Sequence, residues 1–423
     1  MKVAVIGSGG REHAIVKKLK ISSKITELYV IPGNGGISAD AVCVPIPVTD
    51  IPAVTDFIKE NGIEFVVVTP DDPLVAGMVD AINAIGVPCF GPDKKAAVIE
   101  GSKVFSKDLM KKYNIPTAAY EVFTDIESAL KYIETAPLPT VIKADGLALG
   151  KGVVIAETRE AARDAVKSMM ADKIFGDSGN QIVIEEFLTG PEVSVLAFTD
   201  GKTLVPMVSA MDHKRARDND EGLNTGGMGT IAPNPYYTAD VAKICMDTIF
   251  MPTVTAMSSE GRPFKGCLFF GLMITPKGPK VIEYNCRFGD PETQVVLPLL
   301  ESDLFDIMRA CENGTLDKTQ VKFKDAAACC VVLASNGYPQ KYESGFPITV
   351  DSDIDATLYF AGAKIADTLV SAGGRVVGVT AVAENLPTAI NKAYAATEKV
   401  HFENAYKRTD IGKRALRAVN LED

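Results

Sequence analysis

The chain has 423 residues, 47% of them hydrophobic and 23% charged, which is an ordinary balance for a folded globular protein. Because a typical domain holds about 150 residues, the length gives a first expectation of three domains. With 44 basic and 54 acidic residues the formal charge is −10, which argues against a nucleic-acid-binding surface. No apolar run reaches membrane-spanning length, and residues 1–6 lead into a predicted strand without a signal peptide.

The eight cysteines form no Cys-x-x-Cys pair, and most lie in apolar runs such as residues 326–333. This pattern is typical of buried free thiols in a reducing compartment. We therefore expect a cytoplasmic protein.

The first hundred residues alternate short apolar runs with helical patterns. Residues 3–6, 28–31 and 65–68 are predicted to be buried parallel strands, and residues 11–19 and 53–61 connecting helices. This alternation predicts an N-terminal doubly wound α/β domain with a parallel sheet.

A glycine-rich segment, residues 7–13, lies between the first strand and its helix. Glycines let a ligand approach the backbone, and a helix N-terminus attracts anions, so Arg11 here suggests a phosphate monoester. A plain structural turn explains the segment nearly as well. Dinucleotide binding fits less well, because the Gly-x-Gly-x-x-Gly spacing ends on Glu12 and the second strand is followed by Pro32 rather than an acid.

From about residue 139 the pattern becomes rich in short strands with helices between them, which suggests α+β layers. The predicted strands are residues 140–143, 153–156, 182–187, 193–198 and 204–209, and the predicted helices are residues 158–170 and 239–259. A polar loop over residues 212–229 separates them, and residues 266–275 and 280–286 are predicted to pair around the turn 276–279. A further unit begins with a strand at 328–334 and ends in a helical pattern over 386–400 and a basic tail.

Residues 142–153 place Lys143 on a strand, then a glycine-rich loop, then a second strand. Such a loop, with its backbone N–H groups and lysines, can close over the phosphates of a nucleotide. It is not a Walker A motif, because the Gly-Lys-Ser/Thr ending and the following helix are both missing.

Two further polar segments have weaker meanings on their own. Residues 185–192 end a strand with three acids, where the backbone could bond an adenine and a carboxylate a ribose. Within the loop 212–229, cations could receive anions and glycines permit close approach, although a solvated charged loop is the usual explanation. His213 in this loop could act as a general base or, more simply, position its neighbours.

The most informative stretch is residues 281–292, in which a predicted strand carries Glu283 and Asn285 and leads to Arg287. Strand side chains alternate between faces, so these three point the same way. A carboxylate, an amide oxygen and a fixed guanidinium in one row suit Mg²⁺ that holds nucleotide phosphates. The alternative is a surface strand with polar residues on its wet face.

With these segments in order, the chain closely resembles the glycinamide ribonucleotide synthetase (phosphoribosylamine–glycine ligase) family of ATP-grasp enzymes, over nearly its whole length. The matching stretches are residues 7–14, 101–103, 142–153, 212–229, 283–294 and 408–415. The resemblance implies an N-terminal substrate-binding domain (1–100), an ATP-grasp domain (101–325) with a small lid at about 121–188, and a small C-terminal α+β domain (326–423).

The resemblance also implies site residues. Metal ligands would be Glu283 and Asn285. Catalytic residues would be Arg287, Asp212, Lys214 and Asp290. The ATP contacts would be Lys103, Lys143, Gly150, Glu185, Glu186, Phe187, Leu188 and Glu192. The substrate contacts would be Gly10, Arg11, Glu12, Asn34, Asp71, Asn224, Thr225 and Gly226.

In this family ATP phosphorylates the carboxylate of glycine, and the amine of 5-phosphoribosylamine attacks the glycyl phosphate, giving glycinamide ribonucleotide, ADP and phosphate in purine biosynthesis. Carboxylates are poor electrophiles, so activation is needed, and Mg²⁺ (or Mn²⁺) with cations stabilises the transferred charge. The implied partners are glycine, phosphoribosylamine and ATP, with no nucleic acid and no membrane. We expect a monomer, and the resemblance leaves room for transient contact with neighbouring purine-pathway enzymes.

Three departures from the family pattern stand out: Asp71 replaces a longer acid, Leu223 replaces a proline, and residues 266–275 carry no carboxylate for a second metal. Two rival functions remain open. One is a biotin carboxylase-like or formate-using ATP-grasp relative with another acceptor. The other is a nucleotide sensor that binds ATP without turnover.

Overall fold

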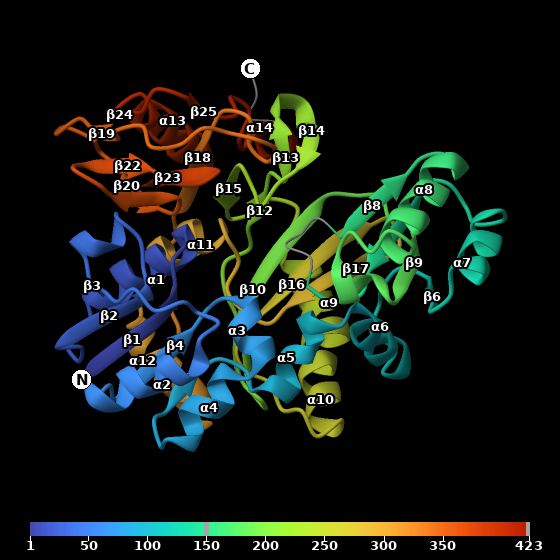
Figure 1. The fold of residues 1–423 in the computed structure, drawn as a ribbon, viewed down its shortest axis with the longest axis horizontal. Coiled ribbons are helices and arrows are strands. Elements are labelled where there is room, and N and C mark those ends of the chain that lie inside the picture. Colours follow the sequence, from blue (N-terminus) through green and yellow to red (C-terminus); the bar gives the residue numbers. More distant parts are fainter. Residues whose placement is uncertain (148–151, 420–423) are drawn as a thin grey trace.

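The computed structural model describes residues 1–147 and 152–419. In Figure 1 the N-terminal part of the chain (blue) and the C-terminal part (orange to red) are stacked on one side, and a small lid (teal to green) stands on the other. A long sheet (green to gold) runs between them. Within the described ranges, no helix is long and apolar enough to cross a membrane.

The N-terminal domain is a parallel sheet in the order β3-β2-β1-β4-β5. Its strands are β1 Lys2–Gly7, β2 Glu27–Pro32, β3 Val42–Cys43, β4 Phe65–Val68 and β5 Cys89–Phe90. Its helices are α1 Gly10–Lys20, η1 Ile37–Ala39, α2 Ile51–Glu60, α3 Asp71–Ala76 and α4 Met78–Ala84. The three predicted strands and two predicted helices are confirmed. The strand order reverses between β1 and β4, which is where ligands bind in doubly wound sheets.

Two helices, α5 Lys94–Gly101 and α6 Lys103–Lys112, lead from this domain to the lid. The lid is an antiparallel sheet in the order β6-β9-β7-β8. Its elements are β6 Tyr120–Phe123, α7 Ile126–Ile133, β7 Thr140–Ala144, β8 Val153–Ala156, α8 Arg159–Met170, η2 Gly176–Gly179 and β9 Ile182–Glu186. Apolar residues of α7, α8 and the sheet form the lid's own core.

The central sheet has the order β11-β10-β16-β17. Its strands are β10 Glu192–Asp200, β11 Leu204–Pro206, β16 Lys265–Thr275 and β17 Gly278–Asn285. The predicted hairpin of β16 and β17 is confirmed, with a bulge beside Gly271. The predicted helix 239–259 is also confirmed, as α9 Ala239–Cys245, a π-helical η4 Met246–Phe250 and α10 Met251–Ser259. Helices α11 Thr293–Leu299 and α12 Leu304–Asn313, followed by η5 Leu316–Lys318, continue the chain.

The C-terminal sheet has the order β12-β15-β18-β23-β20, with β25 beside β18. Its strands are β12 Met211–Asp212, β15 Gly229–Ala232, β18 Ala327–Ser335, β20 Thr357–Phe360, β23 Arg375–Ala383 and β25 Ala405–Tyr406. Shorter elements complete this part: β19 Thr349–Val350, β21 Ala363–Ile365, β22 Leu369–Ser371, α13 Leu386–Thr397, β24 Val400–His401 and α14 Lys413–Ala418. The predicted helix 386–400 thus ends early, at Thr397.

The prediction of a polar loop over residues 212–229 is wrong in part. A hairpin of β13 Arg215–Arg217 and β14 Glu221–Asn224, with η3 Asp218–Asp220 at its tip, lies between β12 and β15. Its strands are short and charged, so they carry no apolar alternation that a sequence pattern could detect. Because β12 and β15 join the C-terminal sheet, this segment ties the middle of the chain to its end; the domain boundaries near residues 100 and 325 stay a prediction.

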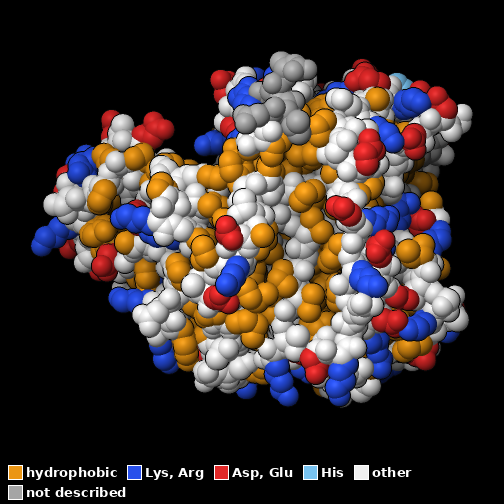
Figure 2. Space-filling model, turned by 180° about the vertical axis from the view of Figure 1, so that it is seen from behind, with side chains coloured by type: hydrophobic (Ala, Val, Ile, Leu, Met, Phe, Trp, Pro, Cys, Tyr) orange, Lys and Arg blue, Asp and Glu red, His pale blue; other side chains and the backbone are white. Residues whose placement is uncertain are grey.

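On the face seen in Figure 2, basic and acidic side chains are intermixed around the rim, and hydrophobic side chains gather toward the middle. This mixture fits the formal charge of −10 rather than a surface for nucleic acid.

Several helices begin at residues whose side chains cap them. The side chains of Asp50, Asp93, Ser102 and Thr158 accept a backbone N–H at the starts of α2, α5, α6 and α8, respectively.

Candidate active site

The predicted row on β17 is present in the structure. Glu283, Asn285 and Arg287 are partly exposed, whereas Tyr284 and Cys286 between them are buried, so the first three face one side. The strand itself ends at Asn285, one residue earlier than predicted. Opposite Glu283 on β16 stands Gly271, where a Cβ atom would lie 2.9 Å from the Glu283 Cγ atom, so the glycine makes room for the carboxylate.

A carboxylate that the sequence analysis missed holds this row. Glu100, at the end of α5, accepts hydrogen bonds from Asn285 Nδ2 at 3.0 Å, from the Cys286 backbone N–H at 2.7 Å and from Arg287 Nη2 at 2.8 Å. Burial raises the pKa of Glu100, and the charge of Arg287 opposes that rise. Because a carboxylate only accepts, the NH₂ group of Asn285 turns toward Glu100, and its amide oxygen accepts no hydrogen bond from the residues that the structure describes.

Lys214 lies between two carboxylates of the site. Its Nζ atom is 3.3 Å from Glu192 Oε2 and 3.6 Å from Glu283 Oε1. The charge of Glu192 is the main cause of the raised pKa of Lys214. The charge of Lys214 is in turn the main cause of the lowered pKa of Glu283. Nearby, burial and the charge of Glu292 raise the pKa of Asp212 well above its usual value. The site therefore brings several acids together, and the charge of Lys214 acts on Glu192, Glu283 and Asp212.

Two buried lysines meet a buried glutamate where the lid joins the rest of the chain. Glu185 forms ion pairs of 3.0 Å with both Lys107 and Lys143. Lys143 also donates to the backbone oxygen of Ile282 on β17, which links the lid to the strand that carries the predicted metal ligands Glu283 and Asn285, named the metal strand below. Burial lowers the pKa of Lys107 to about 8. Lys107 was not predicted as a site residue, because a lysine within a helix carries no local signal of its distant partner.

Lys103 stands at the start of the glycine-rich loop. Its Nζ atom donates to the Gly146 backbone oxygen at 2.7 Å, and burial lowers its pKa. Beside it, Asp145 accepts from Ser102 Oγ and from the Val104 backbone N–H. These bonds fasten the first residues of the loop to α6. Gly150, predicted as an ATP contact, lies outside the described residues.

The strand end after β9 carries the remaining predicted ATP contacts. Glu186 is exposed, with its Oε2 atom 3.4 Å from Lys280 Nζ, while Phe187 and Leu188 are half-buried. The backbone of these residues adjoins the buried cluster of Glu185. This edge can receive a flat ring against apolar side chains, with backbone groups available for hydrogen bonds.

In the first glycine-rich loop, internal packing explains much of the glycine requirement. Glu12 is almost fully buried and accepts from the Gly9 N–H at 2.5 Å and from Thr69 Oγ1 at 2.7 Å. A Cβ atom at Gly7, where φ is +129°, would lie 2.5 Å from the Glu12 side chain. A Cβ atom at Gly10 would lie 2.6 Å from the side chain of Gln294. The buried Glu12 side chain therefore fixes the conformation of this loop through its hydrogen bonds and its packing against Gly7.

Arg11 reaches from this loop to the end of the metal strand. Its Nη1 atom donates to the Phe288 backbone oxygen at 3.1 Å, and its Nε atom donates to Glu12 at 2.5 Å. The Arg11 backbone N–H points at Asp290 Oδ2, 3.3 Å away. The first loop and the end of the metal strand therefore form one surface rather than two separate ones.

Two other predicted substrate residues, Asn34 and Asp71, differ in how many hydrogen bonds their side chains already make within the protein. Asn34 donates to the backbone oxygens of Ser8 and Phe360 and accepts from the N–H groups of Gly36 and Ile37, so its side chain is saturated. Asp71, at the start of α3, accepts only from the adjacent backbone N–H among the bonds of the described residues. Burial lowers the pKa of Arg287, but the charges of Glu100 and then Asp71 outweigh that effect and raise it.

The segment Asn224, Thr225 and Gly226 leaves β14 and turns back toward the site. Thr225 donates from its hydroxyl to the Lys214 backbone oxygen at 2.9 Å. Arg375 of β23, which the sequence analysis missed, donates to the Gly226 backbone oxygen at 2.9 Å and pairs with Asp290 Oδ1 at 3.3 Å. Arg375 therefore joins the C-terminal domain to both sides of the site.

The donor set fits a magnesium ion shared with a nucleotide. Among the described residues, no three His, Cys, Asp or Glu side chains cluster to hold a metal ion by themselves. Glu283 and the amide oxygen of Asn285 provide two hard oxygen donors on one face. Mg²⁺ typically takes one or two protein oxygens and completes its octahedron with phosphates and water.

A lid sheet and a central sheet with buried lysines between them, facing a carboxylate–amide row, define an ATP-grasp protein. The comparison with family models agrees. Residues 1–100 match the model of the phosphoribosylglycinamide synthetase N domain, residues 101–293 that of its ATP-grasp (A) domain, and residues 328–414 that of its C domain. The chain belongs to the phosphoribosylglycinamide synthetase family, and the resemblance seen in its sequence is confirmed.

Individual relatives support this assignment. The phosphoribosylamine–glycine ligase of Agrobacterium fabrum is 48% identical over 419 residues, covering 98% of this chain and 99% of that protein. The crystal structure of phosphoribosylamine–glycine ligase from Thermotoga maritima superposes with a TM-score of 0.86 at 34% identity, over 97% of this chain and 100% of that one.

A biotin carboxylase from Campylobacter jejuni has a TM-score of 0.74 at only 12% identity, over 96% of this chain and 93% of that one, which shows a shared fold and no more. The biotin carboxylase-like alternative therefore loses its support.

Proposed function

We propose that this chain ligates glycine to 5-phosphoribosylamine with ATP, giving glycinamide ribonucleotide, ADP and phosphate in the second step of de novo purine synthesis. The observation that carries the proposal is the row of Glu283, Asn285 and Arg287, which faces Lys214 and adjoins the buried lysines of the lid. Similarity to named ligases of this kind along 98% of the chain supports the choice of substrates.

In this proposal the nucleotide lies between the lid and the central sheet. Lys103 and Lys143 meet its phosphates, Glu192 meets the ribose, and the edge formed by Glu185, Glu186, Phe187 and Leu188 receives the adenine. Glu283 and Asn285 hold Mg²⁺ (or Mn²⁺), which when bound neutralises charge on the phosphates. Gly150 belongs to the same prediction.

Activation of glycine comes first. One oxygen of its carboxylate attacks the γ-phosphorus of ATP, a P–O bond forms, and the bond to ADP breaks. The chain's task is to hold two anions together and to stabilise the charge in transit. Arg287, kept in place by Glu100, and Lys214 are the cations positioned to do this.

Ligation follows. The amine of phosphoribosylamine attacks the carbonyl carbon of the glycyl phosphate, the C–N bond forms, and phosphate leaves with an oxygen that came from glycine. The attacking amine must lose a proton, and Asp290 is the carboxylate that the proposal places beside the amines. Asp290 has its pKa lowered by Arg375 and Arg11 against the effect of burial, so it stays charged beside the amines.

The sugar phosphate lies between the first loop and the hairpin segment. Its proposed contacts are Gly10, Arg11, Glu12, Asn34, Asp71, Asn224, Thr225 and Gly226. Glu12 and the saturated side chain of Asn34 shape this pocket through the backbone they hold. Among the described residues the Asp71 carboxylate accepts only from the adjacent backbone N–H, so it has room to contact the sugar, through water rather than directly because its side chain is short.

The proposal includes a monomer in the cytosol, with room for transient contact with neighbouring enzymes of the pathway. The cysteines support a reducing compartment, because all eight are free and seven of them are buried.

A phosphate-release assay with ATP, Mg²⁺, glycine and freshly prepared phosphoribosylamine tests the function. We expect phosphate only when all components are present, and glycinamide ribonucleotide in equal amount. No release with the complete mixture would refute the ligase and leave an ATP-binding sensor, whereas phosphate release from ATP alone would refute the ligase in favour of an ATPase. Replacement of glycine by bicarbonate or formate serves as the control for other ATP-grasp acceptors.

A further inference from the structure

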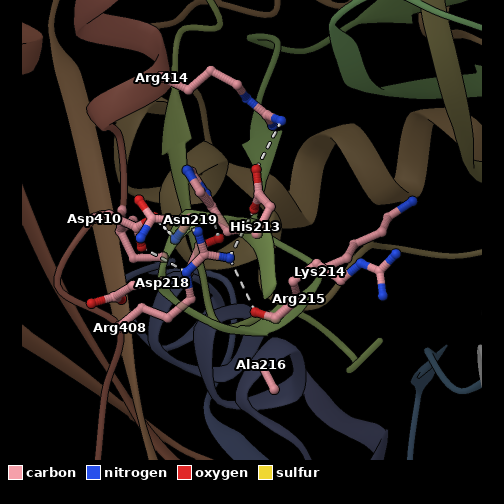
Figure 3. A network of polar contacts seen from close by, with 12 residues as sticks. His213, Lys214, Arg215, Ala216, Asp218, Asn219, Arg408, Asp410 and Arg414 are labelled. Atoms are coloured by element: carbon pink, nitrogen blue, oxygen red, sulfur yellow. Dashed lines mark hydrogen bonds and ion pairs between the residues drawn. The ribbon is translucent and has the colours of Figure 1, made fainter. Parts of the chain in front are cut away.

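The end of the chain is fastened to the β13–β14 hairpin by a buried arginine. Arg408 is only 1% exposed and is one of the largest fully buried side chains of the described residues. Its Nε and Nη2 atoms donate to the two carboxylate oxygens of Asp410 at 2.7 and 2.8 Å. Its Nη1 atom donates to the Arg215 backbone oxygen and to Asp220 Oδ1, both at 3.0 Å (Figure 3).

Neighbouring residues of this segment repeat the attachment. Asp410 Oδ2 accepts from the Asn219 N–H at 2.8 Å, and Asp218 Oδ1 accepts from the Thr409 N–H at 2.8 Å. Further bonds run from the Tyr406 hydroxyl to the Ala216 backbone oxygen at 2.9 Å and from Arg414 Nη1 to Asp220 Oδ2 at 3.3 Å. The chain from residue 406 to 414, which we name the strap, therefore bonds β13 and the tip of the hairpin.

The hairpin needs such support. Every residue of β14 is exposed, and on β13 only Ala216 is buried, so little apolar surface holds the hairpin down. An isolated two-stranded hairpin is marginally stable in water. At its tip, Asn219 and Asp220 have φ values of +59° and +56°, which residues with side chains rarely adopt.

The strap also reaches the residue between Asp212 and Lys214. His213 is buried, with Nδ1 3.2 Å from the Gly229 backbone oxygen and Nε2 accepting from the Gly412 N–H at 3.1 Å. A carbonyl can only accept and an N–H can only donate, so the ring is neutral with its hydrogen on Nδ1. With both nitrogens engaged, His213 is no general base; it fixes the backbone on which its neighbours stand.

We propose that the strap positions the substrate hairpin, and that Arg408 is a positioning residue that acts through the hairpin on Asp212 and Lys214. The inference rests on the proposed function, because it assigns a role to the matching stretch 408–415 that the ligase chemistry leaves unexplained. The strap bonds the two neighbours of Lys214, His213 and Arg215. In Figure 3 the Lys214 side chain itself extends away from the network, and its ammonium pairs with Glu192 and Glu283 of the site.

Arg408→Lys is the first test, since lysine keeps the charge but its single nitrogen, with three donors, cannot replace the four bonds that the guanidinium makes to Asp410, Asp220 and the Arg215 oxygen. Lys407→Gln is the matched control, because Lys407 is adjacent and pairs with Thr397 and Glu398 rather than with the hairpin. In Arg408→Lys we expect amide exchange over residues 213–224 to accelerate, and the KM for glycine to rise on the order of tenfold. ADP affinity should stay within about twofold, because the lid is untouched.

Asp220→Asn provides a second variant should Arg408→Lys fold poorly, since Asp220 is on the exposed hairpin tip and loses the same partner. It should show the same pattern in weaker form. Unchanged exchange over residues 213–224 in both variants, or an equal effect of Lys407→Gln, would overturn the strap. An inactive wild-type protein would contradict the proposed function. The strap would still be tested in that case, because amide exchange over residues 213–224 needs no turnover.

Discussion

Removal of one charge from the metal strand is the most informative perturbation. Glu283→Gln keeps the shape of the side chain and deletes the carboxylate that faces Lys214 and the proposed ion. The side chain is 37% exposed and its ion pair is 3.6 Å long, so the loss should cost less than about 1 kcal/mol in stability. The stabilisation of the transition state for phosphoryl transfer should fall by much more than the stability of the fold.

Groups that stabilise transferred charge are commonly worth about a hundredfold to a thousandfold in rate, or roughly 2.7–4 kcal/mol. Tyr284 offers the internal control, because it follows Glu283 directly, points to the opposite face and is buried. Its hydroxyl bonds Thr253 Oγ1 at 2.9 Å, so Tyr284→Phe should cost about 0.5–1.5 kcal/mol in stability. We therefore expect Glu283→Gln to affect chiefly turnover and Tyr284→Phe to affect chiefly stability.

The assay pairs kcat, measured across a magnesium titration, with the free energy of unfolding. Glu283→Gln should lower kcat strongly and leave stability nearly unchanged, whereas Tyr284→Phe should do the reverse. Near-normal turnover of Glu283→Gln at every magnesium concentration, or a larger loss of turnover in Tyr284→Phe, would refute the assignment of the metal to this strand.

Three further outcomes follow from the contacts. Glu100→Gln should weaken binding of Mn²⁺ with ADP, on the order of tenfold by electron paramagnetic resonance, because the new NH₂ group no longer dictates which way the Asn285 amide turns; unchanged affinity would remove Glu100 from that role. Arg11→Ala should raise the KM for phosphoribosylamine about tenfold to a hundredfold while ADP affinity changes little, and equal losses would indicate misfolding or a wrong assignment of the loop. His213 has a folded pKa of about 4 against 6.5, so the unfolded chain binds the extra proton between these values and stability falls as pH falls through that window. In denaturant titrations His213→Gln should lose this component, up to about 3 kcal/mol, and an unchanged pH slope would contradict it.

The parts of the fold that the sequence predicted are those determined by local patterns. The strands β1, β2 and β4 are continuous apolar runs, and β16 and β17 are joined by a turn with two prolines and a glycine. The row on β17 was predictable for the same reason, because alternation along one strand involves no other part of the chain.

The missed features depend on contacts between distant segments. Glu100 meets Asn285 and Arg287 only after α5 packs beside β17, and Arg375 meets Gly226 only through the C-terminal sheet. Nothing around either residue in the sequence distinguishes it from an ordinary surface charge. The hairpin in residues 212–229 was missed because bonds from the strap, rather than an apolar face, hold it in place.

In the proposed mechanism the chain activates glycine as an acyl phosphate before it joins glycine to the amine. Glycine labelled with ¹⁸O in its carboxylate tests this directly, in a complete reaction with ATP and phosphoribosylamine followed by mass spectrometry of the phosphate. We expect one ¹⁸O atom in each phosphate released, because that oxygen bridges carbon and phosphorus in the intermediate. Unlabelled phosphate formed together with glycinamide ribonucleotide would contradict it.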